Sequence, residues 1–483
     1  MTASDSTADT DNIRLERYRA TLPYIDSWAA YKTWQLRVPG VQVAIGHRDQ
    51  VLFSQAYGSA DVENGIRLTT DHLFRIASHS KTFTATALAR LVEAGKLRFD
   101  DPVGDYIPRL AEADSPIATA TVRELAEQSA GVIRDGLDSD HWQLKQPFPD
   151  EDRLLELVLD HGTKTPVGSE FNYSNLGYSL LGLVVAAASG RSYRDYVRAE
   201  IIDRLGLPHT GPDFDESRPI EEYVRGYTGL HAARNRKPID HIDTHAMSSA
   251  TGFYSTAEDL VHYFSAHLPG DERLLTDHSK WLLQHQAWKA SDKEDAGTYG
   301  IGFGNEKVDG TRVVGHSGGF PGHITQSLFE PESGVVVSVL TNCAAGPAST
   351  IARGILSLLF AAADETAPGT SLARMPTDVD PSTVTGRFAS NWGVADIALI
   401  GDRLLQLDPG SPTPLDLPVR LEIKDAKTVR ATAGSRFGAI DEDIRYVRDT
   451  SGVITSIRLG GGMSMTPWQV PDDEDPRISS GVA

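Results

Sequence analysis

Apolar and polar positions follow two different periods along the first part of the chain. Residues 13–36 predict a helix, while 41–45 and 51–57 alternate and predict two strands joined by a turn at 47–50. Residues 100–238 carry helical patterns, loops and prolines, with the clearest helices at 152–159 and 176–188. Further elements are predicted in this order: a helix that starts at 255–260, strands at 299–303, 312–315, 324–329 and 335–340, and a helix at 347–362. Strands from both ends of this region around a helical middle predict an α+β domain, an antiparallel sheet flanked by helices with a helical subdomain.

The pattern changes after residue 362. Residues 363–381 contain three prolines and no sustained apolar pattern, which is typical of a linker. Short alternating stretches follow and predict a small all-β barrel or sandwich; they lie at 397–400, 403–407, 420–423, 428–431, 444–448 and 454–459. We therefore predict four parts: a large domain at 12–362, a linker at 363–381, a small β-barrel domain at 382–470 and an acidic, disordered tail at 471–483.

An uncharged stretch, residues 82–89, follows Ser78 and Lys81 and predicts a buried helix. Ser78 would lie at the start of this helix, with Lys81 one turn later on the same side. A serine hydroxyl needs a base in contact, and a desolvated lysine loses pKa and can become that base. The alternative is a capping serine followed by a solvated lysine. The uncharged helix favours catalysis, because a lysine at its start is costly unless it is used.

Two more stretches carry polar residues where apolar ones are expected. Tyr173 and Asn175 lie two positions apart before a helix, so an extended turn would point both toward one site. The alternative is a surface tyrosine beside a helix cap made by Ser174 or Asn175. Near Lys81, a tyrosine would have a lowered pKa and could pass a proton between nucleophile and leaving group.

The second stretch, residues 315–319, ends a short strand and spells G-x-S-x-G, so Ser317 is a rival nucleophile. That motif requires a helix next, then an acid and a histidine downstream. Here strand pattern follows, and the only later histidine is His323, so we reject Ser317 as the nucleophile. The glycines are better explained as a strand edge that lets a substrate backbone approach closely.

Composition and charge exclude several classes of function. The net charge of -20 argues against a grip on nucleic acid or anionic membrane. The single cysteine, Cys343, excludes an internal disulfide and a thiolate metal cluster, and we expect it to be buried and inert. His241 and His245 have a spacing that would suit a metal on a helix, but no third ligand is evident, and a solvated loop is favoured. No signal peptide and no membrane-length apolar run is seen, so we predict a cytoplasmic protein.

Three ordered motifs, Ser78-x-x-Lys81, Tyr173-x-Asn175 and His316-x-Gly318, resemble those of the penicillin-recognising serine hydrolases. The match is to the branch with class C β-lactamases, D,D-carboxypeptidases, esterases and D-aminopeptidases, and it extends over about residues 39–362. The tail after the linker resembles a small β-barrel domain often fused to such enzymes. The resemblance implies that Ser78 is acylated, that Lys81 and Tyr173 share the acid and base work, and that Asn175 holds Lys81 and the substrate amide.

The resemblance also implies an oxyanion hole from the backbone N–H groups of Ser78 and Gly319, with Ser317 and Gly318 against the substrate and no cofactor or metal. The third motif of β-lactamases usually has a lysine, whereas this chain has His316, which is mostly neutral at pH 7 and should bind a carboxylate more weakly. We therefore expect hydrolysis of a small ester, amide or short peptide, with a D,D-carboxypeptidase or β-lactamase as the alternative and a non-catalytic binding module as a third reading. The sequence leaves a homo-oligomer open.

Overall fold

The computed structural model describes residues 3–230, 235–293, 296–364, 378–434, 440–460 and 462–478. Contacts divide the chain into two compact units. One, the sheet unit, is Val38–Ser349; the other, the barrel unit, comprises Met1–Arg37 and Thr350–Val482. The predicted domain boundaries stay a prediction, and residues 365–377 of the predicted linker lie outside the described residues.

The sheet unit is built on a nine-stranded antiparallel sheet in the order β3-β2-β1-β13-β12-β11-β10-β9-β8. Its central strands β1 and β13 are buried along their whole length. The strands are β1 (Gly40–His47), β2 (Gln50–Asp61), β3 (Ile66–Arg67), β8 (Trp288–Lys289), β9 (Thr298–Tyr299), β10 (Gly304–Val308), β11 (Thr311–Phe320), β12 (His323–Phe329) and β13 (Val335–Thr341). The strand β10 pairs with only Thr311–Gly315 of β11, so among the described strands the second half of β11 is paired on one edge alone, with β12.

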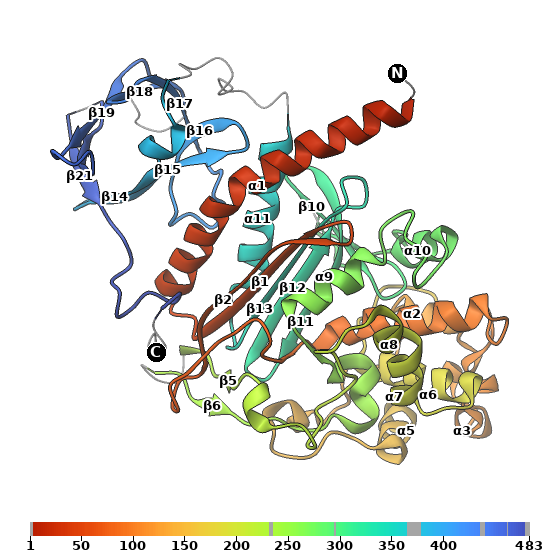
Figure 1. Ribbon diagram of the computed structural model, residues 1–483. Helices are drawn as coiled ribbons and strands as arrows, with labels where there is room; N and C mark the ends of the chain where they lie inside the picture. The colour runs from red at the N-terminus through yellow and green to blue at the C-terminus, as the bar shows by residue number, and fades with distance from the viewer. Residues whose placement is uncertain are drawn as a thin grey trace. The chain divides into compact units, whose positions relative to one another are not determined.

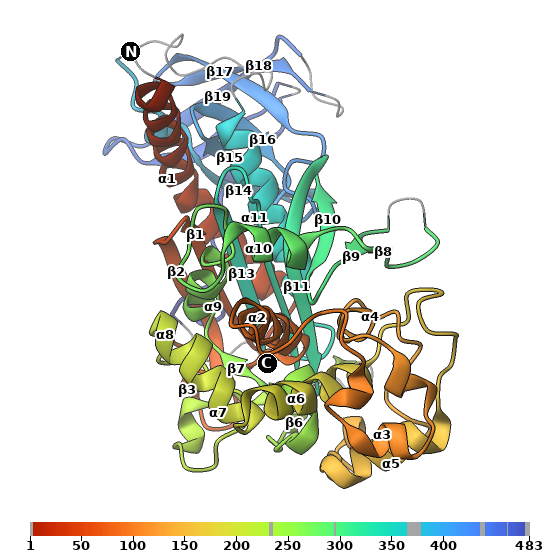
Figure 2. The ribbon, with the colours of Figure 1, turned by 90° about the vertical axis from the view of Figure 1, so that its right-hand side faces the viewer.

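Helices of the same unit accompany this sheet. The helix α9 packs against β1, β12 and β13 (Figure 1), and α2 lies beside α6 and α7 (Figure 2). The helices of the sheet unit are α2 (Ser80–Glu93), α3 (Pro108–Glu112), α4 (Val122–Ala126), α5 (Glu151–His161), α6 (Asn175–Ser189), α7 (Tyr193–Val197), α8 (Asp203–Leu205), α9 (Ala257–Ser265) and α10 (Asp277–Gln284). Two short antiparallel pairs complete the unit, β4 (Phe74–Arg75) with β7 (Tyr254–Ser255) and β5 (Gly226–Tyr227) with β6 (Pro238–Ile239).

The uncharged stretch after Lys81 forms the buried part of α2. Every residue from Ser80 to Ala89 is buried. Its threonine hydroxyls donate to carbonyls one turn back, which satisfies them without water. The helix ends before Gly95, whose φ of +68° is the left-handed conformation that closes many helices.

The barrel unit contains a closed eight-stranded barrel, β14 to β21 in sequence order, with β21 paired back to β14. Alternate residues such as Leu421, Ile423 and Val429 fill its interior. Its strands are β14 (Gly386–Ser390), β15 (Gly393–Ile400), β16 (Arg403–Leu407), β17 (Val419–Asp425), β18 (Thr428–Ala433), β19 (Asp443–Arg448), β20 (Ile454–Arg458) and β21 (Ser464–Pro467). The same unit holds α1 (Ala3–Gln35), and α11 (Ala348–Ala363) lies in it from Thr350 onward.

The structure confirms the α+β prediction with a helical subdomain and a small all-β C-terminal domain. The predicted strand at 299–303 is wrong beyond Tyr299, because Gly302 has a φ of +79° and passes so close to α2 that a Cβ there would lie 2.8 Å from the Lys81 carbonyl oxygen. Residues 471–478 of the predicted disordered tail form turns, and 479–483 lie outside the described residues. Within the described part of the chain, every helix is too short or too polar to cross a membrane.

Candidate active site

Ser78 lies in a tight turn, Ala77–His79, that directly precedes α2. The prediction that Ser78 starts the helix is therefore wrong by two residues, since α2 begins at Ser80. Ala77 has a φ of +49°, a left-handed conformation that costs a non-glycine residue about 1 kcal/mol. The Ser80 hydroxyl donates to the Ala77 carbonyl oxygen at 2.6 Å and helps to hold this turn. The turn leaves the Ser78 side chain half-buried rather than enclosed.

His79 fastens the same turn to the sheet. Its Nδ1 lies 3.1 Å from the Ile76 carbonyl oxygen, and its Nε2 lies 3.0 Å from Ser327 Oγ on β12. Burial lowers the pKa of His79 to about 3, so the ring is neutral at pH 7. The neutral imidazole, with both nitrogens in hydrogen-bond contact, holds the turn against the sheet. The sequence pattern did not predict this structural role for His79.

Lys81 is fully buried in the first turn of α2. Its Nζ donates to Asn175 Oδ1 at 2.7 Å and to the Ala250 carbonyl oxygen at 2.8 Å, and lies 3.2 Å from Ser78 Oγ. Burial lowers the pKa of Lys81 well below its ordinary value of 10.5; the nearby Asp135 carboxylate raises it in part. The side chain is thus a largely dry amine in contact with a serine hydroxyl.

Tyr173 lies on the other side of Lys81, just before α6. Its ring centroid is 4.8 Å from Lys81 Nζ, and the Ser78 hydroxyl is close enough to its phenol to influence the pKa of Tyr173. The predicted lowering of the Tyr173 pKa is wrong. Burial raises this pKa, and the neighbouring Ser78 hydroxyl opposes the rise only in part. Burial is the largest influence on the Tyr173 pKa, ahead of Ser78, Arg134 and Asp135, so burial decides the direction.

Asn175 begins α6, with Ser174 as its cap, and links Lys81 to a residue that the sequence did not reveal. The Asn175 Nδ2 group donates to Asp135 Oδ1 at 2.7 Å, and Trp142 Nε1 donates to the same oxygen at 3.0 Å. Asp135 comes from an irregular loop, in which neither periodicity nor a short motif could have identified it.

His316 on β11 lies close to the same group. Its Nε2 lies 3.0 Å from the Tyr299 hydroxyl, and its Nδ1 lies 2.6 Å from the Ser317 carbonyl oxygen. Burial, and then the neighbouring Lys81, lower the pKa of His316 to about 4. The ring is therefore neutral at pH 7, with Nδ1 donating to the carbonyl and Nε2 accepting from the phenol. Tyr299 is a further residue that the sequence did not single out.

The glycines of β11 differ in what surrounds them. A Cβ on Gly318 would lie 2.2 Å from the Ile76 carbonyl oxygen and 2.4 Å from Thr325 Oγ1, so this glycine allows the strand to touch the chain just before Ser78. Ser317 and Gly319 are exposed on the opposite face. After Ser317 the chain continues as β11 into a turn and β12, so the helix that a nucleophile elbow requires does not follow it.

The remaining candidates lie apart from this group. His241 lies in an irregular loop, as predicted, but it is half-buried: its ring stacks on Phe214 at 5.3 Å, and burial lowers its pKa to about 3. His245 is largely exposed beside Asp243. Across the described ranges, no three His, Cys, Asp or Glu side chains are grouped to hold a metal ion. Cys343 is buried with a pKa raised to about 11 by burial, which agrees with an inert thiol.

Comparison with known proteins gives a consistent picture. A family model described as Beta-lactamase matches residues 25–362. Penicillin-binding protein 4 of Amycolatopsis lactamdurans is 28% identical over 315 residues, which are 63% of this chain and 81% of that protein. Protein flp of Staphylococcus aureus (strain MRSA252) is 22% identical over 66% of this chain, and the chain spans 62% of its length.

Solved structures extend the likeness. The D-amino acid amidase from Ochrobactrum anthropi SV3, complexed with L-phenylalanine amide, has a TM-score of 0.59 and 25% identity over 69% of this chain and 95% of that chain. An octameric penicillin-binding protein homologue from Pyrococcus abyssi has a TM-score of 0.63 over 92% of this chain and 100% of that chain. At 21% identity, the second likeness concerns the fold alone.

Proposed function

Since the chain belongs to the Beta-lactamase family, whose model covers residues 25–362, we propose that it is a metal-independent serine hydrolase. It cleaves a small ester or amide through an acyl-enzyme on Ser78. The family consists of serine hydrolases, with penicillin-binding proteins and D-amino acid amidases among the relatives. One observation carries the proposal: a buried lysine with a strongly lowered pKa has its Nζ 3.2 Å from the Ser78 hydroxyl.

Lys81 is the general base in this proposal. Its neutral amine takes the Ser78 proton while Ser78 Oγ forms a bond to the substrate carbonyl carbon. The resulting oxyanion accepts hydrogen bonds from the backbone N–H groups of Ser78 and Gly319. Burial supports this role, because it makes the amine available at a pH at which a solvated lysine would be an ammonium.

Tyr173 is the general acid. Its raised pKa keeps it a phenol, which can give its proton to the leaving alcohol or amine as the bond to the carbonyl carbon breaks. The proton held by Lys81 then restores the phenol. Water attacks the acyl-enzyme, the acid product leaves, and Ser78 regains its hydroxyl. The exposed Ser317 and the close-packed Gly318 line the strand along which the substrate lies.

His316 bears on whether the substrate carries a carboxylate that the site must recognise. A ring with a pKa near 4 carries no charge at pH 7, so it does not attract a substrate carboxylate. This favours an ester, an amide or a short peptide over the substrates of a D,D-carboxypeptidase or β-lactamase, which remain the alternative. The D-amino acid amidase among the solved relatives supports an amide with a D-residue. A non-catalytic module is disfavoured, because Ser78, Lys81 and Tyr173 are all kept.

The test is a panel of chromogenic substrates: p-nitrophenyl acetate, D-alanyl p-nitroanilide and a cephalosporin. We expect the ester and anilide to be hydrolysed faster than the cephalosporin, and Ser78→Ala to abolish turnover. Ser169→Ala, which changes an exposed serine of the same unit, is the matched control. Mass spectrometry of the trapped protein should find the acyl group on Ser78. An adduct on Ser317, or full turnover by Ser78→Ala, would overturn the proposal.

A further inference from the structure

The side-chain amide of Asn175 stands between a base and an acid. Its oxygen accepts from Lys81 Nζ at 2.7 Å, and its nitrogen donates to Asp135 Oδ1 at 2.7 Å. The oxygen and the NH₂ group of a side-chain amide are nearly the same size, so the hydrogen-bond partners decide which way the amide is oriented. A turned amide would place its NH₂ group against the lysine.

The orientation of this amide determines whether Lys81 can act as a base. A neutral amine has two hydrogens and one lone pair. The two hydrogens are directed to Asn175 Oδ1 and to the Ala250 carbonyl oxygen, so the lone pair is left for the Ser78 hydroxyl at 3.2 Å. If the NH₂ group of Asn175 faced the amine, it would donate into that lone pair and remove the base.

Asp135 lies where it opposes this reversal of the Asn175 amide. An ionised carboxylate only accepts hydrogen bonds, so it requires the NH₂ side of the amide. Its Oδ1 is also held by Trp142 Nε1, and the preceding carbonyl oxygen, of Arg134, accepts from the backbone N–H groups of Asn175 and Leu176 at 2.9 and 3.1 Å. The loop is thereby fixed to the start of α6 by both backbone and side chain.

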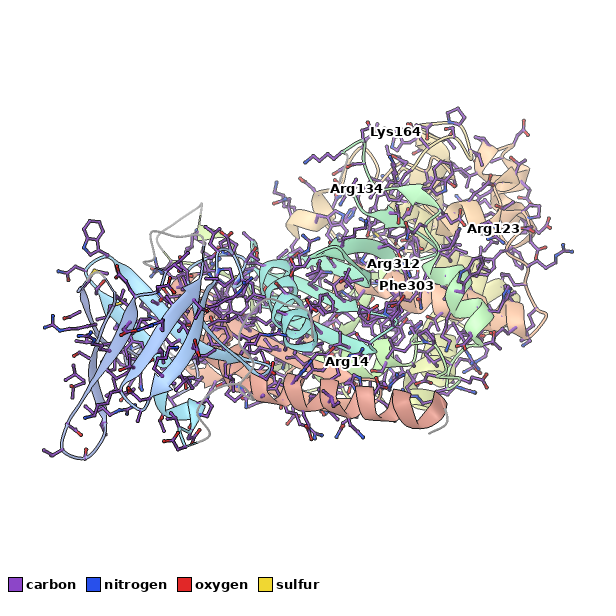
Figure 3. The ribbon with its side chains drawn as sticks, turned by 90° about the horizontal axis from the view of Figure 1, so that it is seen from above. Arg14, Arg123, Arg134, Lys164, Phe303 and Arg312 are labelled. Carbon is purple, nitrogen blue, oxygen red and sulfur yellow. The ribbon has the colours of Figure 1, made fainter. Side chains whose placement is uncertain are left out.

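Building on the proposed function, we propose that Asp135 is a positioning residue, which holds the Asn175 amide with its oxygen toward Lys81 and leaves the lysine lone pair to Ser78. It acts through Asn175 and Lys81 and does not itself touch the reacting atoms. Its carboxylate is 15% exposed. Its neighbour Arg134, labelled in Figure 3, is 67% exposed and lies over the Tyr173 ring.

Charge gives the proposal a second readout. The groups that face Lys81 are Arg134 and Asp135 from the loop, Tyr173 just before α6, Tyr178 within α6, and His316 from β11. Of these, the Asp135 carboxylate raises the Lys81 pKa and Arg134 lowers it. Removing the Asp135 charge should therefore lower the Lys81 pKa and move the acid limb of the kcat/KM profile to lower pH.

The decisive variant is Asp135→Asn, which keeps the shape but can donate as well as accept. We expect kcat for p-nitrophenyl acetate to fall about tenfold to a hundredfold, with the acid limb moved to lower pH. Asp138→Asn removes one charge from an exposed position of the same loop and should change neither. Asp135→Glu, which keeps the charge, should leave the limb in place, and thermal unfolding reports whether each variant folds.

A double variant tests the route of action. If Asp135 works through the amide, Asp135→Asn should change kcat less than about twofold in an Asn175→Ala background. An equal loss in both backgrounds, or a wild-type kcat and acid limb in Asp135→Asn, overturns the proposal while Ser78→Ala still abolishes turnover. Full activity of Ser78→Ala in the same assay would instead overturn the proposed function and this inference with it.

Discussion

Gly318→Ala should damage the candidate site although no reacting group is changed. The added Cβ would lie 2.2 Å from the Ile76 carbonyl oxygen and 2.4 Å from Thr325 Oγ1, both far inside normal contact. The Ile76 oxygen also bonds the His79 backbone N–H at 3.2 Å and lies 3.1 Å from the His79 ring. Relief of the clash must therefore move the turn that carries Ser78.

The size of the effect follows from the distance. A contact at 2.2 Å has to lengthen by about 1 Å to become an ordinary one. Overpacking of this kind costs about 1–3 kcal/mol of folding free energy. A displacement of about 1 Å at a reacting group can cost about a hundredfold in rate. We expect losses of this order in stability and in kcat/KM for p-nitrophenyl acetate.

Gly319→Ala is the matched control for stability. A Cβ at Gly319 meets only Ile324 Cδ1, at 3.7 Å, which is ordinary contact. Chemical denaturation should therefore leave Gly319→Ala close to wild type and show the loss in Gly318→Ala. Equal stability of the two variants, or wild-type kcat/KM in Gly318→Ala, would refute the argument from close approach.

Three further outcomes are expected. Asp213→Ala removes the carboxylate that lies 3.1 Å from the buried Arg75 guanidinium, and denaturation should show a loss of about 3–5 kcal/mol in the free energy of unfolding. The control Glu156→Ala removes an exposed ion pair and should lower that free energy by less than about 1 kcal/mol. Lys81→Arg cannot supply a base and should lower kcat/KM by about a hundredfold or more, so an unchanged rate would contradict the proposed role. The folded-state pKa of His316, about 4, lies below the ordinary 6.5, so its contribution to stability is complete above pH 6.5 and is lost as the pH falls through 4. His316→Asn should flatten the dependence of the unfolding free energy on pH between about pH 4 and 6.5. An unchanged slope would contradict a lowered His316 pKa in the folded state.

Periodicity predicted the elements whose burial repeats regularly. The uncharged run after Lys81 identified α2, and alternation identified six of the barrel strands within a few residues of their observed bounds. The two strands that close the barrel, β14 and β21, are short, and their alternation is weak because many of their residues are exposed. The long helix α1 begins at Ala3 rather than near residue 13, because its polar first turns carry no apolar repeat.

Spacing predicted the centre of the site but not its surroundings. Ser78 and Lys81 are one turn apart on one chain segment, so local geometry alone brings them together. Asp135 reaches Asn175 from an irregular loop, a meeting that only the tertiary fold creates. The direction of the Tyr173 pKa could not be predicted either, since it depends on how much water the fold removes from both the phenol and the lysine.

The turn that carries Ser78 depends on tertiary contacts that the Ser78-x-x-Lys81 motif does not describe. Ala77 holds a left-handed φ of +49°, which its own side chain disfavours, so the surrounding structure must impose it. Three contacts hold this conformation. Ser80 Oγ donates to the Ala77 carbonyl oxygen, and the His79 ring lies within hydrogen-bond distance of Ser327 on β12. The Ile76 N–H donates to the Phe253 carbonyl oxygen at 2.9 Å. Each of these contacts joins the turn to a different part of the fold. A serine and a lysine three residues apart on an ordinary helix would lack this frame, and the hydroxyl would then not be held against the amine.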